Sequence, residues 1–221
     1  MGARISTGKN NKQDYATPAD FMAAVARRFG PIAFDLAAHT NNTKSPNYFA
    51  PVTGPEGPLP VDPAAYGMDA FDHSWDLLSC SLFRNGGRKG LLWLNCEFND
   101  IPRWTERVRK ESETGANILS LTPASVGSVW FDALVASHAN VYLFRPRLAF
   151  IPGESYNKDC MLSHFVSPSD RDNNFPFICT WDWKRDKITH LWQLTELDVN
   201  EILGEETQMQ LRQPPAVSKI E

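Results

Sequence analysis

Four residues with chemically useful side chains stand together where the chain reads Asn95-Cys96-Glu97-Phe98. The amide of Asn95 can accept and donate hydrogen bonds, and the Cys96 thiol becomes a nucleophile when it loses its proton. Glu97 adds a carboxyl group, and Phe98 adds an aromatic face for stacking. Such a set can orient a polar substrate at one site.

An apolar segment precedes these residues, and two similar segments occur elsewhere. Three buried strands are therefore predicted, over 32–36, 90–95 and 117–122. Helical patterns of 10–15 residues alternate with strands, which is typical of parallel βαβ units. We expect an α/β fold, Rossmann-like, with an open, mostly parallel sheet and helices on both faces. Ligands of such sheets bind beyond the carboxyl ends of the strands, where Asp35, Asn95 and Thr122 fall.

Local signals predict the remaining elements. Thr17-Pro18-Ala19-Asp20 predicts a helix start with Thr17 as N-cap, and Gly30-Pro31 predicts the end of that helix. Further helices are expected over 101–113 and 126–137, and further strands over 141–144, 148–151 and 176–181. Residues 39–67 and 152–173 show no convincing period, and such long loops in a compact domain are usually functional.

Length and composition fit a globular protein. The chain has 221 residues, of which 42% are hydrophobic and 22% charged. We expect one domain over 15–204, between a flexible arm at 1–14 and a disordered tail at 205–221. No apolar run approaches the roughly 20 residues that span a bilayer, and no signal peptide is visible at the N-terminus. A cytoplasmic protein that does not bind membranes is therefore expected.

The sequence excludes several kinds of site. It contains no Cys-x-x-Cys pair and no His at metal-ligand spacing, so we expect neither a zinc site nor a disulfide framework. Phosphate-loop and serine-hydrolase motifs are also missing. The net charge of −4 gives no general attraction to nucleic acid, although local basic clusters can supply one. Two such clusters are Arg103, Arg107, Arg109 and Lys110, and Arg145 with Arg147.

Several segments, in order, match the pattern of one family. They are Tyr15-Ala-Thr-Pro18, the stretch from Phe34 to Phe49, Met68-Asp69-Ala70-Phe71 with Trp75, the strand into Asn95 with Trp104, Leu121-Thr122-Pro123-Ala124 with Trp130-Phe131, Arg147-Leu-Ala-Phe150, and Phe175-Pro176. This ordered set resembles the phage DNA N-6-adenine methyltransferase family, a Dam-like group of class I methyltransferases. The resemblance covers residues 15–181.

The resemblance implies that S-adenosylmethionine binds over the strand ends beside a flipped-out base of double-stranded DNA. Asn95 and a backbone carbonyl of the next residue would accept hydrogen bonds from the amino group that is methylated, N6 of adenine. Phe98 would stack on the extruded base. Where the family carries Asn-Pro-Pro-Tyr, this chain carries Asn-Cys-Glu-Phe.

The resemblance also implies cofactor-binding residues. Thr17 and Pro18 would close over the methionine end of the cofactor, and Asp35 would lie near its amino group. Asp69 would meet the ribose or adenine, with Ala70 and Phe71 packing on the ring. No glycine-rich turn follows Asp35, but the small residues Ala37 and Ala38 permit close approach.

The Cys96-Glu97 pair leaves three alternatives open. It is a tolerated variant in which Asn95 still orients an amino group, since the prolines mainly fix φ. Alternatively, Cys96 attacks a pyrimidine for C5-directed modification, with Glu97 on the ring. In the third alternative the protein is inactive and binds DNA or protein. For DNA contact we expect Arg147, Lys158, Arg171, Asn173 and Asn174.

Overall fold

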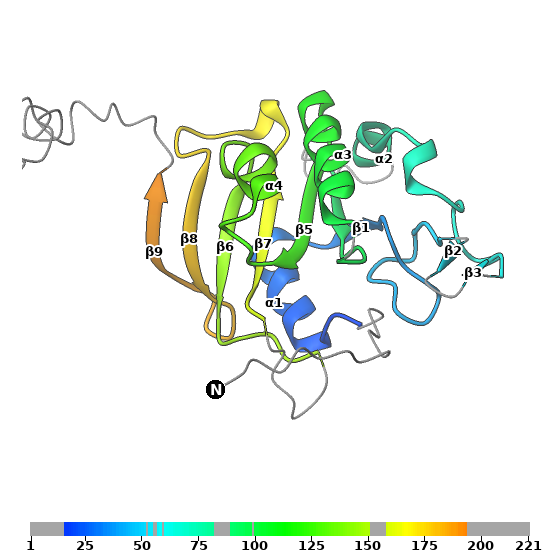
Figure 1. The fold of residues 1–221 in the computed structure, drawn as a ribbon, viewed down its shortest axis with the longest axis horizontal. Helices are drawn as coiled ribbons and strands as arrows, with labels where there is room; N and C mark the ends of the chain where they lie inside the picture. The colour runs from blue at the N-terminus through cyan, green and yellow to red at the C-terminus, as the bar shows by residue number, and fades with distance from the viewer. Residues whose placement is uncertain are drawn as a thin grey trace, which may run out of the picture.

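The computed structural model describes residues 16–51, 53–54, 57–58, 60–81, 89–98, 100–150 and 158–193. The predicted arm at 1–14 and tail at 205–221 lie outside these residues. A seven-stranded sheet has the order β1-β4-β5-β7-β6-β8-β9, and β2 pairs with β3 separately (Figure 1). The strands are β1 (Ile32–Asp35), β2 (Thr53–Gly54), β3 (Gly57–Pro58), β4 (Leu91–Leu94), β5 (Asn117–Pro123), β6 (Asn140–Arg145), β7 (Cys160–Phe165), β8 (Phe177–Asp182) and β9 (Lys187–Gln193).

The sheet is mixed, so the α/β class is confirmed and the expected mostly parallel sheet is wrong. The neighbours β1–β4, β4–β5 and β6–β8 are parallel. The neighbours β5–β7, β7–β6 and β8–β9 are antiparallel. The difference arises because β7 enters between β5 and β6 in the reverse direction, and because β9 turns back along β8.

Two strands of the seven-stranded sheet were not predicted, the short strands β2 and β3 lie in the predicted loop 39–67, and one predicted strand is wrong. Residues 160–165 lie in the segment read as a loop, yet β7 is a central strand. The strand β9 was not predicted. Residues 148–150 of the predicted strand 148–151 form no strand, although Leu148 is buried among the side chains on one sheet face. The segment 148–150 is therefore apolar because it packs on the sheet, although it does not pair as a strand.

Three helices lie close to their predicted positions: α1 (Ala19–Phe29), α3 (Ile101–Thr114) and α4 (Val129–Phe131), which continues into the π-helical turn η2 (Asp132–Ala136). The helix α2 (Trp75–Ser81) was not predicted. The predicted N-cap of α1 is wrong. Pro18 occupies that position, no side chain caps the helix, and Thr17 lies before it. At the other end Gly30 has a φ of 99°, which favours glycine and ends the helix.

The sheet separates two hydrophobic layers, as side-chain alternation requires. Leu92 and Leu94 pack in one layer with side chains of α2, α3 and η2. Leu91 and Trp93 pack in the other layer with Phe21 and Val25 of α1. Helices therefore cover both faces, as predicted. No helix among the described residues combines the length and apolarity required to cross a membrane.

The sheet continues beyond β1 through two isolated parallel bridges. Asp35 pairs with Tyr48, and Phe49 pairs with Gly67. The Phe49 N–H donates to Asp35 O at 3.0 Å, and the Ala50 N–H donates to Gly67 O at 3.1 Å. The chain thus leaves β1 on one side toward Tyr48 and later returns on the other side as β4. Such a change of direction is a topological switch point, with its crevice at the carboxyl end of β1.

The packing of β7 gives a stability prediction. Leu162 is fully buried in this central strand, so Leu162→Ala should lower the free energy of unfolding by about 2–5 kcal/mol. Chemical denaturation monitored by tryptophan fluorescence measures the change. Val129→Ala is the control, because Val129 is 85% exposed and its truncation should change stability by about 0.5 kcal/mol or less. Equal effects would contradict a central position for β7.

Candidate functional site

The predicted catalytic and cofactor-binding residues meet at one end of the sheet. Asp35 ends β1, Asn95 follows β4, and Thr122 lies near the end of β5. These three strands are parallel and adjacent, so their carboxyl ends share one end of the sheet. Residues 68–71 follow the Gly67 bridge, which also runs parallel to its neighbour. We call this the carboxyl end of the sheet and the opposite one the amino end.

A side-chain contact joins two of the predicted site residues. The Asn95 amide Nδ2 donates a hydrogen bond to Thr17 Oγ1 at 3.2 Å, across 78 positions of sequence. Thr17 is only 4% exposed, and Asn95 is partly buried. Because the Asn95 nitrogen donates to Thr17, the carbonyl oxygen Oδ1 of the same amide is left as a hydrogen-bond acceptor. Sequence analysis singled out both residues but gave Thr17 a different role.

Cys96 lies in the hydrophobic core. Its side chain packs in the layer that contains Leu94, Val108 and Phe131. Burial, with smaller effects of Asp100 and Glu97, raises the pKa of the Cys96 thiol to about 12. A thiol with so high a pKa is protonated near neutral pH and is therefore a poor nucleophile. By contrast, Glu97 is exposed, and Phe98 is partly buried.

The Asp35 carboxylate organises the loop that follows β1. One oxygen accepts the Lys44 N–H at 2.8 Å, and the other accepts the Ala37 N–H at 3.3 Å. Burial raises the pKa of Asp35 to about 6 despite these hydrogen bonds. Both carboxylate oxygens thus hold backbone of residues 37–44. A cofactor at this end would meet that loop, where Ala37 is partly buried.

The segment after Gly67 presents an aromatic cluster. Asp69 is exposed, and its side chain accepts the Phe71 N–H at 2.9 Å, which caps the short 3-10 helix η1 (Ala70–Asp72). Ala70 is buried in the core. The Phe71 ring lies 4.5 Å from the Trp104 ring, and the Arg103 guanidinium lies 4.1 Å above Phe71. Trp104 and Arg103 thus contact Phe71, one of the predicted cofactor residues. Sequence spacing alone did not predict these contacts.

The five residues expected to contact DNA lie at opposite ends of the sheet. Pro123 pairs with Cys160, so Lys158 lies at the carboxyl end, and Arg147 forms an ion pair there with Asp159 at 2.5 Å. Arg171, Asn173 and Asn174 follow β7, whose last residue Phe165 pairs with Ile118 at the start of β5. These three residues therefore lie at the amino end.

Arg171 at the amino end is held by protein groups. Its Nη2 donates to Glu113 Oε1 at 2.6 Å, and its Nε donates to Val166 O at 3.1 Å. The basic cluster on α3 is similarly balanced, since Arg103, Arg107 and Lys110 each form an ion pair with an acid on the same helix or its cap. Neither group offers concentrated positive charge.

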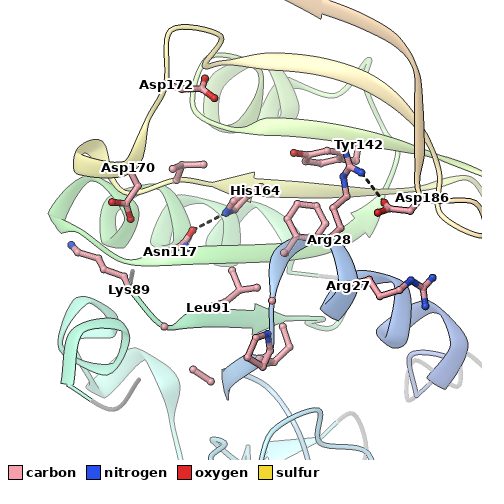
Figure 2. Close-up of a pocket in the computed structure, with 17 residues that line it drawn as sticks. Arg27, Arg28, Lys89, Leu91, Asn117, Tyr142, His164, Asp170, Asp172 and Asp186 are labelled. Carbon is pink, nitrogen blue, oxygen red and sulfur yellow. Dashed lines mark hydrogen bonds and ion pairs between the residues drawn. The ribbon is translucent and has the colours of Figure 1, made fainter. Parts of the chain in front are cut away.

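A cleft of about 1270 Å³ opens at the amino end (Figure 2). On its floor His164 Nε2 and Asn117 Oδ1 are 2.7 Å apart, and burial lowers the pKa of His164 to about 4. Arg28 pairs with Asp186 on one side at 2.7 Å. Because the cleft surrounds the first residues of the parallel strands, it lies away from Asn95 and Thr17. We therefore assign the candidate site to the carboxyl end.

One further polar group at the carboxyl end is notable. Thr122 Oγ1 is buried and has no hydrogen-bond partner among the described residues. An unpaired buried hydroxyl costs stability and often marks a site where a ligand or water supplies the partner. Within the described part of the chain, no group of three or more His, Cys, Asp or Glu side chains is arranged to hold a metal ion.

Comparison with known proteins adds no identification. No protein-family model matches the chain. No curated protein matches it either. The functional argument therefore rests on the residues, the fold and the geometry of the carboxyl end.

His164, which is partly buried and lines the cleft, gives a pH prediction. Its pKa in the folded state is about 4 against 6.5 for the free side chain, so acidification from pH 6.5 to 4 protonates the unfolded chain first and favours unfolding. His164→Gln keeps a hydrogen-bond donor but cannot titrate. The stability advantage of the wild type over this variant should shrink by about 2–3 kcal/mol between about pH 7 and pH 4.5. Urea denaturation at each pH measures it, and an unchanged difference in stability between the two proteins would contradict a neutral His164 in the folded state.

Proposed function

We propose that this protein is an S-adenosylmethionine-dependent DNA methyltransferase that transfers a methyl group to N6 of a flipped-out adenine. One observation carries the proposal: Asn95, at the carboxyl end of β4, is oriented through its amide nitrogen by the buried Thr17. The two residues come from the separate segments that resemble the family's Tyr-x-Thr-Pro and Asn-Pro-Pro-Tyr elements.

The fold supports a Rossmann-like, class I assignment. The adjacent parallel strands β1, β4 and β5, with the parallel bridges at Tyr48 and Gly67, create a switch point at the carboxyl end of β1. Open α/β sheets bind their ligands at such a point. Asn95 and the loop after Asp35 flank it, so the predicted catalytic and cofactor residues share the position where a ligand is expected.

The residues present fit the cofactor. Ala37 and Ala38 keep the loop after β1 small, and the Asp35 carboxylate fixes its backbone. Asp69 and the partly buried Phe71 offer an exposed carboxylate and an aromatic ring for a ribose and an adenine. When bound, S-adenosylmethionine supplies an electrophilic methyl group on a sulfonium sulfur.

The role of Asn95 follows from the chemistry of an exocyclic amine. The nitrogen lone pair of adenine N6 is delocalised into the ring, so the amine is a weak nucleophile. An acceptor oxygen that takes a hydrogen bond from one amino hydrogen orients the nitrogen and favours the localised lone pair. Asn95 supplies such an oxygen, while its amide nitrogen donates to Thr17 Oγ1. Orientation of this kind contributes much of the rate in transfer reactions.

The buried thiol favours an amine over a pyrimidine carbon as the methylated atom. Attack on carbon 6 of a pyrimidine requires a thiolate, whereas the pKa of Cys96 is about 12 and its side chain packs in the core. We infer that Cys96 has a packing role and that Asn95 orients the amine that is methylated. Phe98 would stack on the extruded base.

The central test combines S-adenosylmethionine carrying a labelled methyl group with unmodified double-stranded DNA. After digestion to nucleosides, mass spectrometry identifies the labelled base, and N6-methyladenine is the expected product. A labelled pyrimidine would overturn the choice of atom. Absence of label, with cofactor binding confirmed by calorimetry, would mean that the fold binds its ligands without methylating this DNA.

Asn95 gives the first activity prediction. Asn95→Ala removes the acceptor oxygen and should lower kcat by about a hundredfold or more. Asn95→Asp keeps an acceptor oxygen at the same place and should retain far more activity than Asn95→Ala. Steady-state methylation of DNA measures both. Equal losses in the two variants would contradict the acceptor role.

Thr17 gives a second prediction, with a control of matched size. Thr17→Val removes the hydroxyl and should lower kcat about fivefold, the value of one hydrogen bond of about 1 kcal/mol, with little change in the KM for the cofactor. Thr17→Ser keeps the hydroxyl and should stay near wild type. A rise in that KM at unchanged kcat would instead place Thr17 on the cofactor.

Cys96 gives a third prediction. Cys96→Ser keeps the size of the side chain, so methyl transfer should persist, with a loss in unfolding free energy of about 1–3 kcal/mol from burying a hydroxyl in the apolar core. Activity assayed well below the melting temperature separates the two effects. Complete loss of activity in a folded variant would support a nucleophilic Cys96.

A further inference from the structure

Positive charge gathers at one part of the carboxyl end. Arg145 ends β6 and pairs in register with Asp182 at the end of β8, so the turn between β8 and β9 lies beside it. The six basic residues here, called the basic rim, are Arg145, Arg147, Lys158, Lys184, Arg185 and Lys187, and all are exposed. They come from three separate segments of the sequence, 145–147, 158 and 184–187.

The basic rim keeps an excess of positive charge after its ion pairs are counted. Asp159 pairs with Arg147, and Asp182 lies 3.7 Å from Arg185. The other acid of the turn, Asp186, pairs with Arg28 of α1. Among the described residues, no ion pair is formed by Arg145, Lys158, Lys184 or Lys187. These four cations stand out on a chain whose net charge is −4.

Charge is distributed unevenly between the two ends of the sheet. At the amino end the cleft is lined by Asp170 and Asp172, and Arg171 between them is paired with Glu113. Of the cations that line the cleft, Arg28 pairs with Asp186 and Lys89 lies 3.5 Å from Asp76, so the amino end shows no excess of cations comparable to the basic rim. A polyanion is therefore attracted more strongly to the basic rim.

We infer that the basic rim binds the phosphate backbone of the duplex DNA whose base enters the Asn95 site. The inference rests on the proposed function for the identity of the polyanion. It adds Arg145, Lys184, Arg185 and Lys187 to the expected contacts Arg147 and Lys158, and it assigns no phosphate contact to Arg171, Asn173 or Asn174. Lysine and arginine contacts of this kind fix the orientation of a duplex without reading its sequence.

The test compares two double variants that each remove two positive charges. Lys158→Gln with Lys184→Gln alters the basic rim, and Arg109→Gln with Lys110→Gln removes two cations of α3 outside it. Binding of a fluorescent duplex is measured by anisotropy over a range of salt concentrations, without cofactor. The rim variant should bind about tenfold more weakly near 0.15 M salt, and its log–log salt dependence should fall by about 1.8. The control variant should keep the wild-type slope.

Three results would overturn the assignment: equal slopes in the two variants, a larger loss in the control variant, or tighter binding of duplex RNA through the same residues. Methylation of DNA is measured separately on the wild type. If the rim residues are needed for DNA binding but the wild type does not methylate DNA, the proposed enzyme activity is rejected and the DNA-binding role of the basic rim is retained. If the wild type methylates DNA but the rim variant binds DNA as tightly as the wild type, the enzyme activity is retained and the role of the basic rim is rejected.

Discussion

The buried carboxylate of Asp35 is the constraint on which the carboxyl end of the sheet depends. Its two oxygens hold the backbone of Ala37 and Lys44, while its own backbone bridges to Tyr48. The loop after β1 is thereby closed against the strand and passes on to Phe49, which bridges to Gly67. Burial keeps the pKa of Asp35 near 6, so near neutral pH the ionised form accepts both hydrogen bonds. An uncharged residue in this place would leave the loop less firmly held.

The sequence predicted those elements that follow a single clear pattern. The strand before Asn95 and the helix α3 lie within one or two residues of their expected bounds. Apolar runs identified β1, β4 and β5 because parallel strands covered on both faces are apolar throughout. The same reasoning failed for β7, where Ser163 and His164 interrupt the apolar pattern. His164 is accommodated by Asn117 on the neighbouring strand, a contact across 47 positions that no local pattern reveals.

The sequence predicted the positions of the candidate residues in the fold more accurately than their contacts. Asp35, Asn95 and Thr122 do lie at one end of the sheet, because the ends of adjacent parallel strands coincide. Thr17 was read as a local helix cap, but its hydroxyl contacts Asn95, since α1 begins beside the end of β4. The expected DNA contacts lie at opposite ends of the sheet because the strand β7, which was not predicted, runs from the carboxyl end to the amino end between Lys158 and Arg171. Tertiary topology, not residue type, decides these outcomes.

Alternation of side chains distinguishes the two reactive neighbours, Asn95 and Cys96. Consecutive residues of an extended chain point to opposite faces, so only one of them can face a given site. Cys96 continues the face of Leu92 and Leu94 into the core beneath α3, where its thiol is buried and protonated. Asn95 continues the face of Leu91 and Trp93 toward α1 and meets Thr17. The amide is therefore the group that the fold leaves at the carboxyl end. Under the proposed function, the Cys96-Glu97 pair would therefore alter the loop and leave a nitrogen as the methylated atom.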